Sequence, residues 1–340
     1  MQLLKARALR QYKPFYVALF VTKNCNFRCS YCYGKFYTKE KDLPLDRIQY
    51  IIDELAKAGT KRVCLLGGEP LLRDDIGTIV DYLASKNIDV IINTNGSLIE
   101  KRINDIRSVS HLYVSFDGRK EAHEANRGAA TYEKTVGGIE AALANGFPVG
   151  VVSVITKNNI NELPYLVDFC SRRNLSLYVY TAMNQVSDNG RLPIGALPTV
   201  EEYRKVIKEI INFIDRGAPI RYPKQVYLTS LYWPDYAKDY YLNEPPDFPY
   251  IRCFAGKYTC AIDAEGNVFP CVRFCGIEQA GNIFNDGFAQ AWKKVNHHSC
   301  KACHMESVNE MNLFFAFDKN VISNFIRLTL RKEKKHVRTP

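Results

Sequence analysis

Short β-branched runs alternate with longer amphipathic runs through the first half of the chain, and this alternation limits the folds available to it. The short runs are predicted strands at residues 15–21, 62–66, 89–93, 111–115, 149–155 and 176–180. The amphipathic runs are predicted helices at residues 45–58, 76–85, 99–107, 132–144 and 163–173. Strands that alternate with helices form right-handed βαβ units around a parallel sheet. We therefore expect an α/β fold that binds its ligands at the carboxyl ends of the strands.

The chain changes character in its second half. Residues 197–216 are a predicted helix, and residues 217–252 are rich in proline and tyrosine, as in a linker that packs against a surface. Residues 258–269 have the pattern of a β-hairpin, and residues 287–294 that of a short helix. An apolar, aromatic stripe over residues 312–330 predicts a helix docked on the core; an interfacial amphipathic helix is the alternative.

These patterns divide the chain into four predicted parts. We expect an α/β core over residues 1–200, a bridging helix and linker over 201–252, a small hairpin-plus-helix domain over 253–310, and a C-terminal helix with a basic tail over 311–340.

Composition indicates the cellular compartment and the role expected of the cysteines. With 340 residues, 46% of them hydrophobic and 24% charged, the chain has the composition of a globular protein. Its start lacks the pattern of a signal peptide, and no window is apolar enough to span a membrane, so we expect a cytoplasmic protein. In that reducing compartment the 11 cysteines are expected to be metal ligands or buried thiols rather than disulfides.

The formal net charge of +10 is concentrated near the C-terminus. The basic residues there are Arg327, Arg331, Lys332, Lys334, Lys335, His336 and Arg338. A nucleic-acid-binding protein is expected to have a basic face with interleaved aromatic residues, whereas the basic residues of this sequence are concentrated in a tail. We expect a solvated tail rather than a nucleic-acid-binding surface; contact of this tail with an anionic partner such as RNA, or peripheral contact with a membrane surface, is the alternative.

Three cysteines with the spacing CxxxCxxC follow the first predicted strand. They are Cys25, Cys29 and Cys32. Structural zinc sites commonly use two CxxC pairs and close all four coordination positions. Three clustered thiolates instead suit a four-iron cluster in which one iron keeps an open position for a small ligand.

With Tyr31 just before the last of these cysteines, the motif resembles the signature of the radical S-adenosylmethionine (radical SAM) enzymes. The resemblance implies a partial (β/α)6 TIM-like barrel over residues 15–180. It also implies that the open iron of a [4Fe–4S] cluster binds S-adenosylmethionine, which is split by one electron into methionine and a hydrogen-abstracting 5′-deoxyadenosyl radical.

Further motifs of that family stand at the ends of successive predicted strands. Gly67-Gly68-Glu69-Pro70 matches the family's GGEP motif, in which Glu69 is expected to take the methionine ammonium. Asn95 follows the third strand, and the element Ser115-x-Asp117-Gly118 ends the fourth. Arg127 is expected to open a helical stretch and to face the carboxylate of the cofactor. The cofactor-binding residues implied by the resemblance are Tyr31, Gly67, Gly68, Glu69, Asn95, Ser115, Asp117 and Arg127.

A second set of cysteines brackets the predicted C-terminal domain. It comprises Cys253, Cys271, Cys300 and Cys303. This spacing resembles the twitch form of the SPASM extension of radical SAM enzymes, which implies one auxiliary [4Fe–4S] cluster. A tetrahedral zinc site fits the same four thiolates and is the alternative.

Four cysteines remain outside both sets. Cys64 and Cys170 are expected to be buried and inert, because they lie in a predicted strand and a predicted helix. Cys260 and Cys275 are either buried thiols, extra ligands, or a thiol that returns a hydrogen atom to a substrate radical. Because either thiol could be this hydrogen donor, Cys260 and Cys275 are our candidate catalytic residues.

Together these features predict a radical SAM oxidoreductase that abstracts hydrogen from a peptide or small polar metabolite, with the auxiliary cluster supporting oxidation or cross-linking. A one-electron reductant such as flavodoxin or ferredoxin is the implied partner. Residues 180–252 are expected to line the substrate pocket, through Asn184, Gln185, Tyr222, Tyr227, Tyr232 and Tyr236. The alternatives are an epimerase with a cysteine hydrogen donor and a non-catalytic iron–sulfur carrier.

Overall fold

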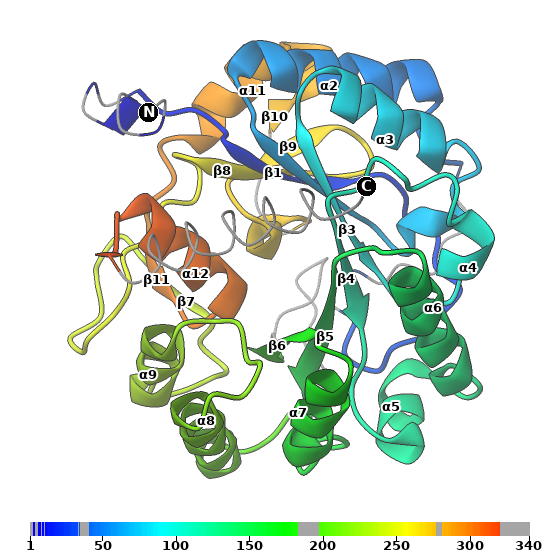
Figure 1. Cartoon of the computed structure of the whole chain (residues 1–340). Coiled ribbons are helices and arrows are strands. Elements are labelled where there is room, and N and C mark those ends of the chain that lie inside the picture. Colours follow the sequence, from blue (N-terminus) through cyan, green and yellow to red (C-terminus); the bar gives the residue numbers. More distant parts are fainter. Residues whose placement is uncertain are drawn as a thin grey trace.

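The computed structural model is built around one nine-stranded sheet with the strand order β10-β9-β8-β1-β2-β3-β4-β5-β6 (Figure 1). It describes Leu3, Ala6, Arg7, Leu9, residues 11–32, Gly34, and residues 41–182, 197–276 and 281–319. Within these residues no helix is both long and apolar enough to cross a membrane.

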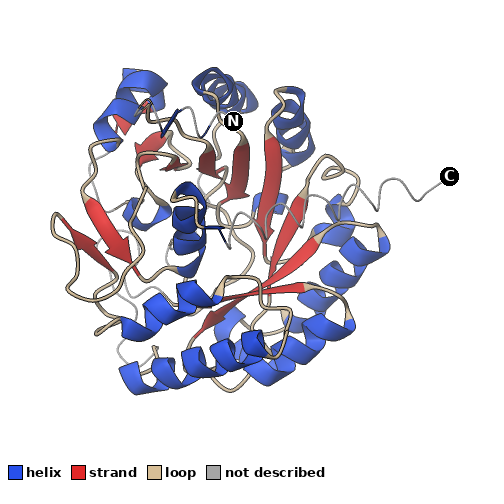
Figure 2. Cartoon of the chain, turned by 60° about the vertical axis from the view of Figure 1, so that its left-hand side comes forward, coloured by secondary structure: helices blue, strands red, loops and turns tan. Residues whose placement is uncertain are grey.

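Six neighbouring strands of this sheet run parallel, in chain order. They are β1 (Tyr16–Phe20), β2 (Arg62–Leu66), β3 (Asp89–Thr94), β4 (His111–Ser115), β5 (Val149–Ile155) and β6 (Ser176–Thr181). The helices between them are α2 (Leu45–Ala58), α3 (Ile76–Ser85), α4 (Ile99–Arg102), α5 (Lys120–Arg127), α6 (Tyr132–Ala144) and α7 (Leu163–Arg172). Figure 2 shows the helices around the outside of the curved sheet. The predicted α/β partial barrel is confirmed.

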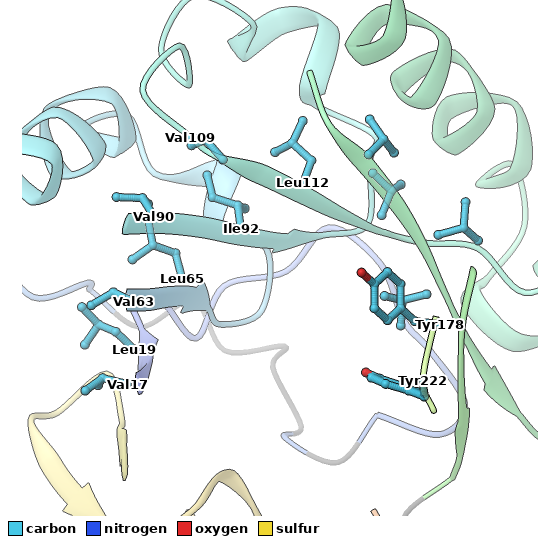
Figure 3. Packing of buried hydrophobic residues seen from close by; sticks show 14 of the residues in the cluster. Val17, Leu19, Val63, Leu65, Val90, Ile92, Val109, Leu112, Tyr178 and Tyr222 are labelled. Atoms are coloured by element: carbon cyan, nitrogen blue, oxygen red, sulfur yellow. The ribbon is translucent and has the colours of Figure 1, made fainter. Parts of the chain in front are cut away.

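Each strand of the barrel has an outer face under the helices and an inner face toward the barrel centre. On the outer face Val17, Leu19, Val63 and Leu65 are completely buried in the main hydrophobic core (Figure 3). Because side chains alternate along a strand, the residues between them, such as Ala18, point inward. The barrel therefore separates a dry core under the helices from an inner face that can hold ligands.

The C-terminal segment extends this same sheet. Strand β8 (Thr259–Ile262) pairs in parallel with β1, and β9 (Asn267–Phe269) returns antiparallel to β8, as the predicted hairpin requires. The hairpin therefore lies directly against the first strand of the barrel.

The following elements complete the described part of the structure. They are η1 (Pro70–Leu72), α8 (Val200–Asp215), α9 (Lys224–Tyr232), β7 (Tyr240–Leu242), η2 (Val272–Phe274), β10 (Gly281–Asn282), α10 (Ile283–Asp286), α11 (Phe288–Val295), β11 (Cys300–Cys303) and α12 (Glu306–Phe315). Strands β7 and β11 form a separate antiparallel pair at the left in Figure 1.

Several predicted elements differ from the structure. Helix α4 ends at Arg102, five residues before the predicted end, and α9 lies inside the predicted linker. Helix α12 begins at Glu306 and ends at Phe315, where residues 312–330 were predicted to be helical. Residues 320–330 of that prediction, and the basic tail with its proposed membrane contact, lie outside the described residues.

Helix α5 was not predicted, and Arg127 ends this helix instead of opening one. The buried face of α5 is polar, formed by His123, Asn126 and Arg127. A search for apolar periodicity finds no stripe in such a helix. Its polar face is part of the site described next.

Candidate functional site

The CxxxCxxC loop leaves the carboxyl end of β1 and is fixed to the turn after β2. The backbone N–H of Gly68 donates to the carbonyl of Thr22 (3.0 Å), and that of Glu69 donates to the carbonyl of Asn24 (2.8 Å). The Thr22 hydroxyl donates to Asp42 (2.7 Å), and Phe27 is buried. The cysteine loop and the GGEP turn thus form one structural unit.

Glycine at position 68 is required by the closeness of this contact. A Cβ atom at Gly68 would lie 2.1 Å from the carbonyl oxygen of Asn24 and 2.9 Å from Cβ of Cys25. The first of these atoms belongs to the backbone, so rotation of a side chain cannot relieve the overlap. Gly67 and Gly68 therefore let the cysteine loop approach this turn, while their contact with the cofactor stays a prediction.

We expect Gly68→Ala to displace the cysteine loop. Iron analysis of the reconstituted variant should show loss of the N-terminal cluster with the auxiliary cluster retained. The matched control is Gly137→Ala in α6, where nothing lies within 4 Å of the added Cβ and where alanine should stabilise the helix by about 0.5–1 kcal/mol. Full iron content in Gly68→Ala would contradict this role of the glycine.

Glu69 is a fully buried carboxylate that ties the end of β2 to the end of β3. It accepts hydrogen bonds from the hydroxyl of Thr94 (2.8 Å) and the backbone N–H groups of Asn95 (2.7 Å) and Leu71 (3.1 Å). Burial raises the pKa of Glu69 to about 7, against the opposing effect of these donors. The carboxylate therefore orients the turn; its direct contact with the methionine ammonium stays a prediction.

Asp117 is the centre of a second buried cluster, in which the structure brings together three of the predicted residues. Its carboxylate accepts from the hydroxyl of Tyr31 (2.8 Å) and pairs with Nε of Arg127 (2.8 Å). Asn126 and the backbone N–H of Val154 donate to it as well (3.4 and 3.2 Å). Because Tyr31 lies between Cys29 and Cys32, this cluster anchors the cysteine loop to β4, β5 and α5.

Two further predicted cofactor residues lie beside these clusters. The side-chain amide of Asn95 donates to Oδ1 of Asn26 in the cysteine loop (2.8 Å), and the amide oxygen of Asn95 accepts from Ser97. Ser115 is the last residue of β4 and is half-buried. Their contact with the cofactor stays a prediction.

The three thiols of the N-terminal loop are candidate ligands of a cubane cluster. Among the described residues, no three His, Cys, Asp or Glu side chains are gathered around one metal position. A [4Fe–4S] cluster does not need such a group, because each thiolate binds a different iron. The backbone N–H of Phe27 already donates to Sγ of Cys25 (3.4 Å). Burial raises the pKa of Cys25 to about 11 and that of Cys29 to about 12, so cluster binding releases protons.

The side chains of the second cysteine set interact with one another. Cys253 and Cys300 are buried in one apolar cluster, with Cys271 packed against it. A hydrogen bond between the thiols lowers the pKa of Cys253 and raises that of Cys300. Cys303 interacts electrostatically with Cys253 and Cys271.

Donors to sulfur surround this second set, as is common around iron–sulfur ligands. The backbone N–H of Ala255 donates to Sγ of Cys253 (3.4 Å), and the side chain of Asn312 in α12 donates to the same thiol. Nearby, the side-chain amide of Asn309 donates to the carbonyl of Cys303 (2.9 Å). Helix α12 therefore supports both ends of the ligand set.

The inner face of the barrel and the second cysteine set meet in one apolar cluster. Ala18 and Phe20 on β1 pack with Phe274, while Leu66, Cys271 and Cys275 are packed against them. Phe20 is the last residue of β1, immediately before the segment that carries the first cysteine set. Both cysteine sets thus flank the same inner surface near the carboxyl ends of β1 and β2.

The remaining cysteines differ in where they lie. Cys64 and Cys170 are buried, as predicted. Cys260 pairs with Val17 across β1 and β8 and belongs to the main core on the outer face of the sheet. Cys275 is half-buried on the inner side, with its thiol 3.9 Å from the carbonyl of Cys271. Of the two catalytic candidates, only Cys275 shares the surface that both cysteine sets flank.

The tyrosines expected to line a pocket have other roles. The Tyr227 hydroxyl donates to the carbonyl of Val179 (3.1 Å), Tyr236 donates to Ser230 (2.7 Å), and Tyr232 is 54% exposed. Tyr222 is buried, stacks on Tyr180 of β6 and donates to its hydroxyl (2.5 Å). Asn184 and Gln185 lie outside the described residues. These tyrosines therefore make contacts within the protein, and their contact with a substrate stays a prediction.

A set of buried polar residues beside the second cysteine set was not predicted from the sequence. Its members are Thr181, Ser230, Asp239, Arg273, His304 and Glu306. Two of them could have been found from their positions next to cysteines, because Arg273 stands two residues after Cys271 and His304 directly follows Cys303.

Comparisons with known families agree with this geometry. The model of the radical SAM superfamily matches residues 19–170, and that of the SPASM iron–sulfur cluster-binding domain matches residues 253–310. These ranges contain the first and the second cysteine set, respectively.

Similar proteins include several enzymes. The AdoMet-dependent heme synthase of Methanosarcina barkeri is 25% identical over 301 residues, 83% of this chain and 83% of that protein. The GTP 3′,8-cyclase of Marinobacter nauticus is 30% identical over 223 residues, 61% of this chain and 67% of that protein. The Fe-coproporphyrin III synthase of M. barkeri is 28% identical over 162 residues, and the chain spans only 40% of its length.

Similar solved structures share the fold. Streptococcus suis SuiB bound to the precursor peptide SuiA has a TM-score of 0.66 and 18% identity, over 85% of this chain and 67% of that chain. Native anSMEcpe with bound AdoMet and the Cp18Cys peptide has a TM-score of 0.64 and 15% identity, over 91% of this chain and 98% of that chain.

Proposed function

Because this chain belongs to the radical SAM superfamily and carries its SPASM iron–sulfur domain, we propose that it abstracts hydrogen from a peptide or small polar metabolite and oxidises or cross-links it. The chain is a radical SAM enzyme with S-adenosylmethionine, a SAM-binding [4Fe–4S] cluster and an auxiliary cluster as its cofactors. Since its relatives are enzymes, the alternative of a non-catalytic carrier is not retained.

One observation carries the proposal. The apolar cluster formed by Ala18, Phe20 and Phe274, with Cys271 packed against it, makes the inner face of β1 continuous with the auxiliary site. A substrate held at the carboxyl ends of β1 and β2 would therefore lie beside both cysteine sets.

The residues of this chain position the cofactors. When bound at Cys25, Cys29 and Cys32, the first cluster supplies the electron that splits S-adenosylmethionine and so makes hydrogen abstraction available. The carboxylate of Glu69 orients the turn that holds this loop, and Asp117 anchors Tyr31 within it. Cys253, Cys271, Cys300 and Cys303 would hold the auxiliary cluster.

A peptide is the substrate class that we favour. The solved structures with this fold include SuiB with a precursor peptide and anSMEcpe with the Cp18Cys peptide. A one-electron reductant such as flavodoxin or ferredoxin is the proposed partner. Epimerisation remains the second candidate, because the Cys275 thiol lies on the inner side, where a hydrogen donor would be needed.

The experiment that separates these outcomes is turnover of short peptides in deuterated water, followed by mass spectrometry. Oxidation or cross-linking predicts a product that lacks two hydrogen atoms and carries no solvent deuterium on the reacting carbon. Deuterium at that carbon without a net loss of hydrogen, and its disappearance in Cys275→Ala with full iron content, would overturn the oxidation proposal in favour of epimerisation.

A further inference from the structure

A chain of buried charged and polar side chains lies behind the auxiliary cysteines. Arg273 and Asp239 form an ion pair, and their side chains are only 3% and 4% exposed. Nε2 of His304 lies 3.2 Å from the other carboxylate oxygen of Asp239. The three residues come from η2, from the segment before β7, and from the end of β11.

The same chain continues to the barrel. Nδ1 of His304 lies 3.1 Å from the hydroxyl of Thr181, the last residue of β6. The carboxylate of Glu306 accepts from the backbone N–H and the hydroxyl of Thr181 (3.1 Å each), and from the hydroxyl of Ser230 (3.3 Å). Asp239 is therefore held by Arg273 and His304, and His304 in turn links it to Thr181 of the barrel.

Arg273 links this chain to the auxiliary cysteines. Its backbone N–H donates to the thiol of Cys271, and its guanidinium acts electrostatically on both Cys271 and Cys303. Lys257 also faces this set, near Cys253 and Cys300, but it is half-buried, so water screens its charge more.

Burial of such an ion pair costs free energy. Two ions removed from water are stable only when each is fully hydrogen-bonded, and apolar residues of similar volume often serve stability as well or better. Arginine keeps its positive charge under all ordinary conditions. In a dry environment its field, and the opposing field of its partner, act strongly on a nearby cluster. The reduction potential of an iron–sulfur cluster depends on exactly such surrounding charges and hydrogen bonds.

We propose that Arg273 and Asp239 set the reduction potential of the auxiliary cluster, with Arg273 raising it and Asp239 opposing Arg273. His304 and Thr181 act as positioning residues, because they fix Asp239 to the carboxyl end of β6. This inference goes beyond the proposed function: it depends on the auxiliary cluster and holds for any substrate.

The test is a redox titration of the full-length chain, monitored by EPR, in a Cys25→Ala/Cys29→Ala/Cys32→Ala background in which only the auxiliary cluster is present. Arg273→Gln removes the positive charge and should make the midpoint potential more negative. Asp239→Asn removes the opposing charge and should make it more positive. Arg273→Lys keeps the charge and should stay closest to the parent, and Arg173→Gln on the outer end of α7 should cause no shift.

Shifts of opposite sign for Arg273→Gln and Asp239→Asn at unchanged iron content would establish the proposal, because loss of a purely structural contact has no reason to change sign. Two shifts of the same sign, or no shift in either variant, would overturn it. Loss of the cluster from both variants would also overturn it, because the ion pair would then be required to form the site. If only one of the two variants binds a cluster, its midpoint potential is compared with that of Arg173→Gln. A shift in the predicted direction supports the proposal, and no shift or an opposite shift overturns it.

Discussion

Replacing Cys29 with alanine is expected to abolish formation of 5′-deoxyadenosine while leaving the auxiliary cluster in place. Cys29 is one of the three proposed cluster ligands in the loop, so its loss should leave too few thiolates to hold a four-iron cluster. The four auxiliary cysteines come from β11 and from segments that flank β8 and β9, whereas Cys29 lies in the loop after β1. Iron analysis should therefore show roughly half the iron of the parent chain.

Cys170→Ala is the matched control for this change. Cys170 is completely buried in α7 and belongs to the main core, away from either cysteine set. The control variant should keep its full iron content and still form 5′-deoxyadenosine, with a modest loss of thermal stability. Product formation by Cys29→Ala at a level near the parent would show that the assignment of this loop is wrong.

Asp117→Asn is expected to destabilise the apo protein by about 3–5 kcal/mol, the cost of leaving one ion of a buried pair without its partner. Arg127 would keep its charge with only 5% of the residue exposed to water. Tyr31 would lose the strength of its hydrogen bond to a carboxylate, so the cysteine loop should loosen too. The measurement is urea unfolding followed by circular dichroism, combined with the rate of cluster loss in the reconstituted variant.

Asp168→Asn provides the comparison, because Asp168 pairs with Arg172 on the exposed surface of α7. Exposed pairs of this spacing contribute only about 0.3–0.5 kcal/mol. We expect a large difference between the two variants. Equal and small losses would contradict the view that Asp117 is the buried anchor of the cysteine loop.

The strands and most helices of the barrel were predictable because their buried faces are apolar and periodic. Helices α2, α3 and α6 have the predicted ends, and the strands differ by no more than a residue at either end. The cofactor motifs were also visible, since each stands where a predicted strand ends. The contacts that these motifs make could not be predicted. Gly68 accommodates the cysteine loop, and the Glu69 carboxylate accepts hydrogen bonds from three donors.

The parts that sequence patterns missed are those whose buried groups are polar. Helix α5 buries His123, Asn126 and Arg127 because Asp117 lies beneath it, and no hydropathy pattern encodes that partner. The chain from Arg273 to Glu306 joins residues far apart in the sequence through hydrogen bonds alone. Its members became recognisable only when β6, β7 and β11 were placed in space.

The spacing of the second cysteine set predicted a ligand group, while the position of that group relative to the barrel came from strand pairing. The register Val17 with Cys260 and Ala18 with Ala261 places Cys260 on the outer face. A shift of one residue would have turned Cys260 inward, because successive side chains point to opposite faces. The choice between Cys260 and Cys275 as catalytic candidates therefore could not be made from the sequence.

The most direct test of the central claim is to incubate the anaerobically reconstituted chain with S-adenosylmethionine and a strong reductant and to quantify 5′-deoxyadenosine. We predict that the parent protein forms it, that the Cys29→Ala variant does not, and that its yield rises when a suitable peptide is added. Absence of 5′-deoxyadenosine from a parent protein whose N-terminal cluster is intact by EPR would contradict the account.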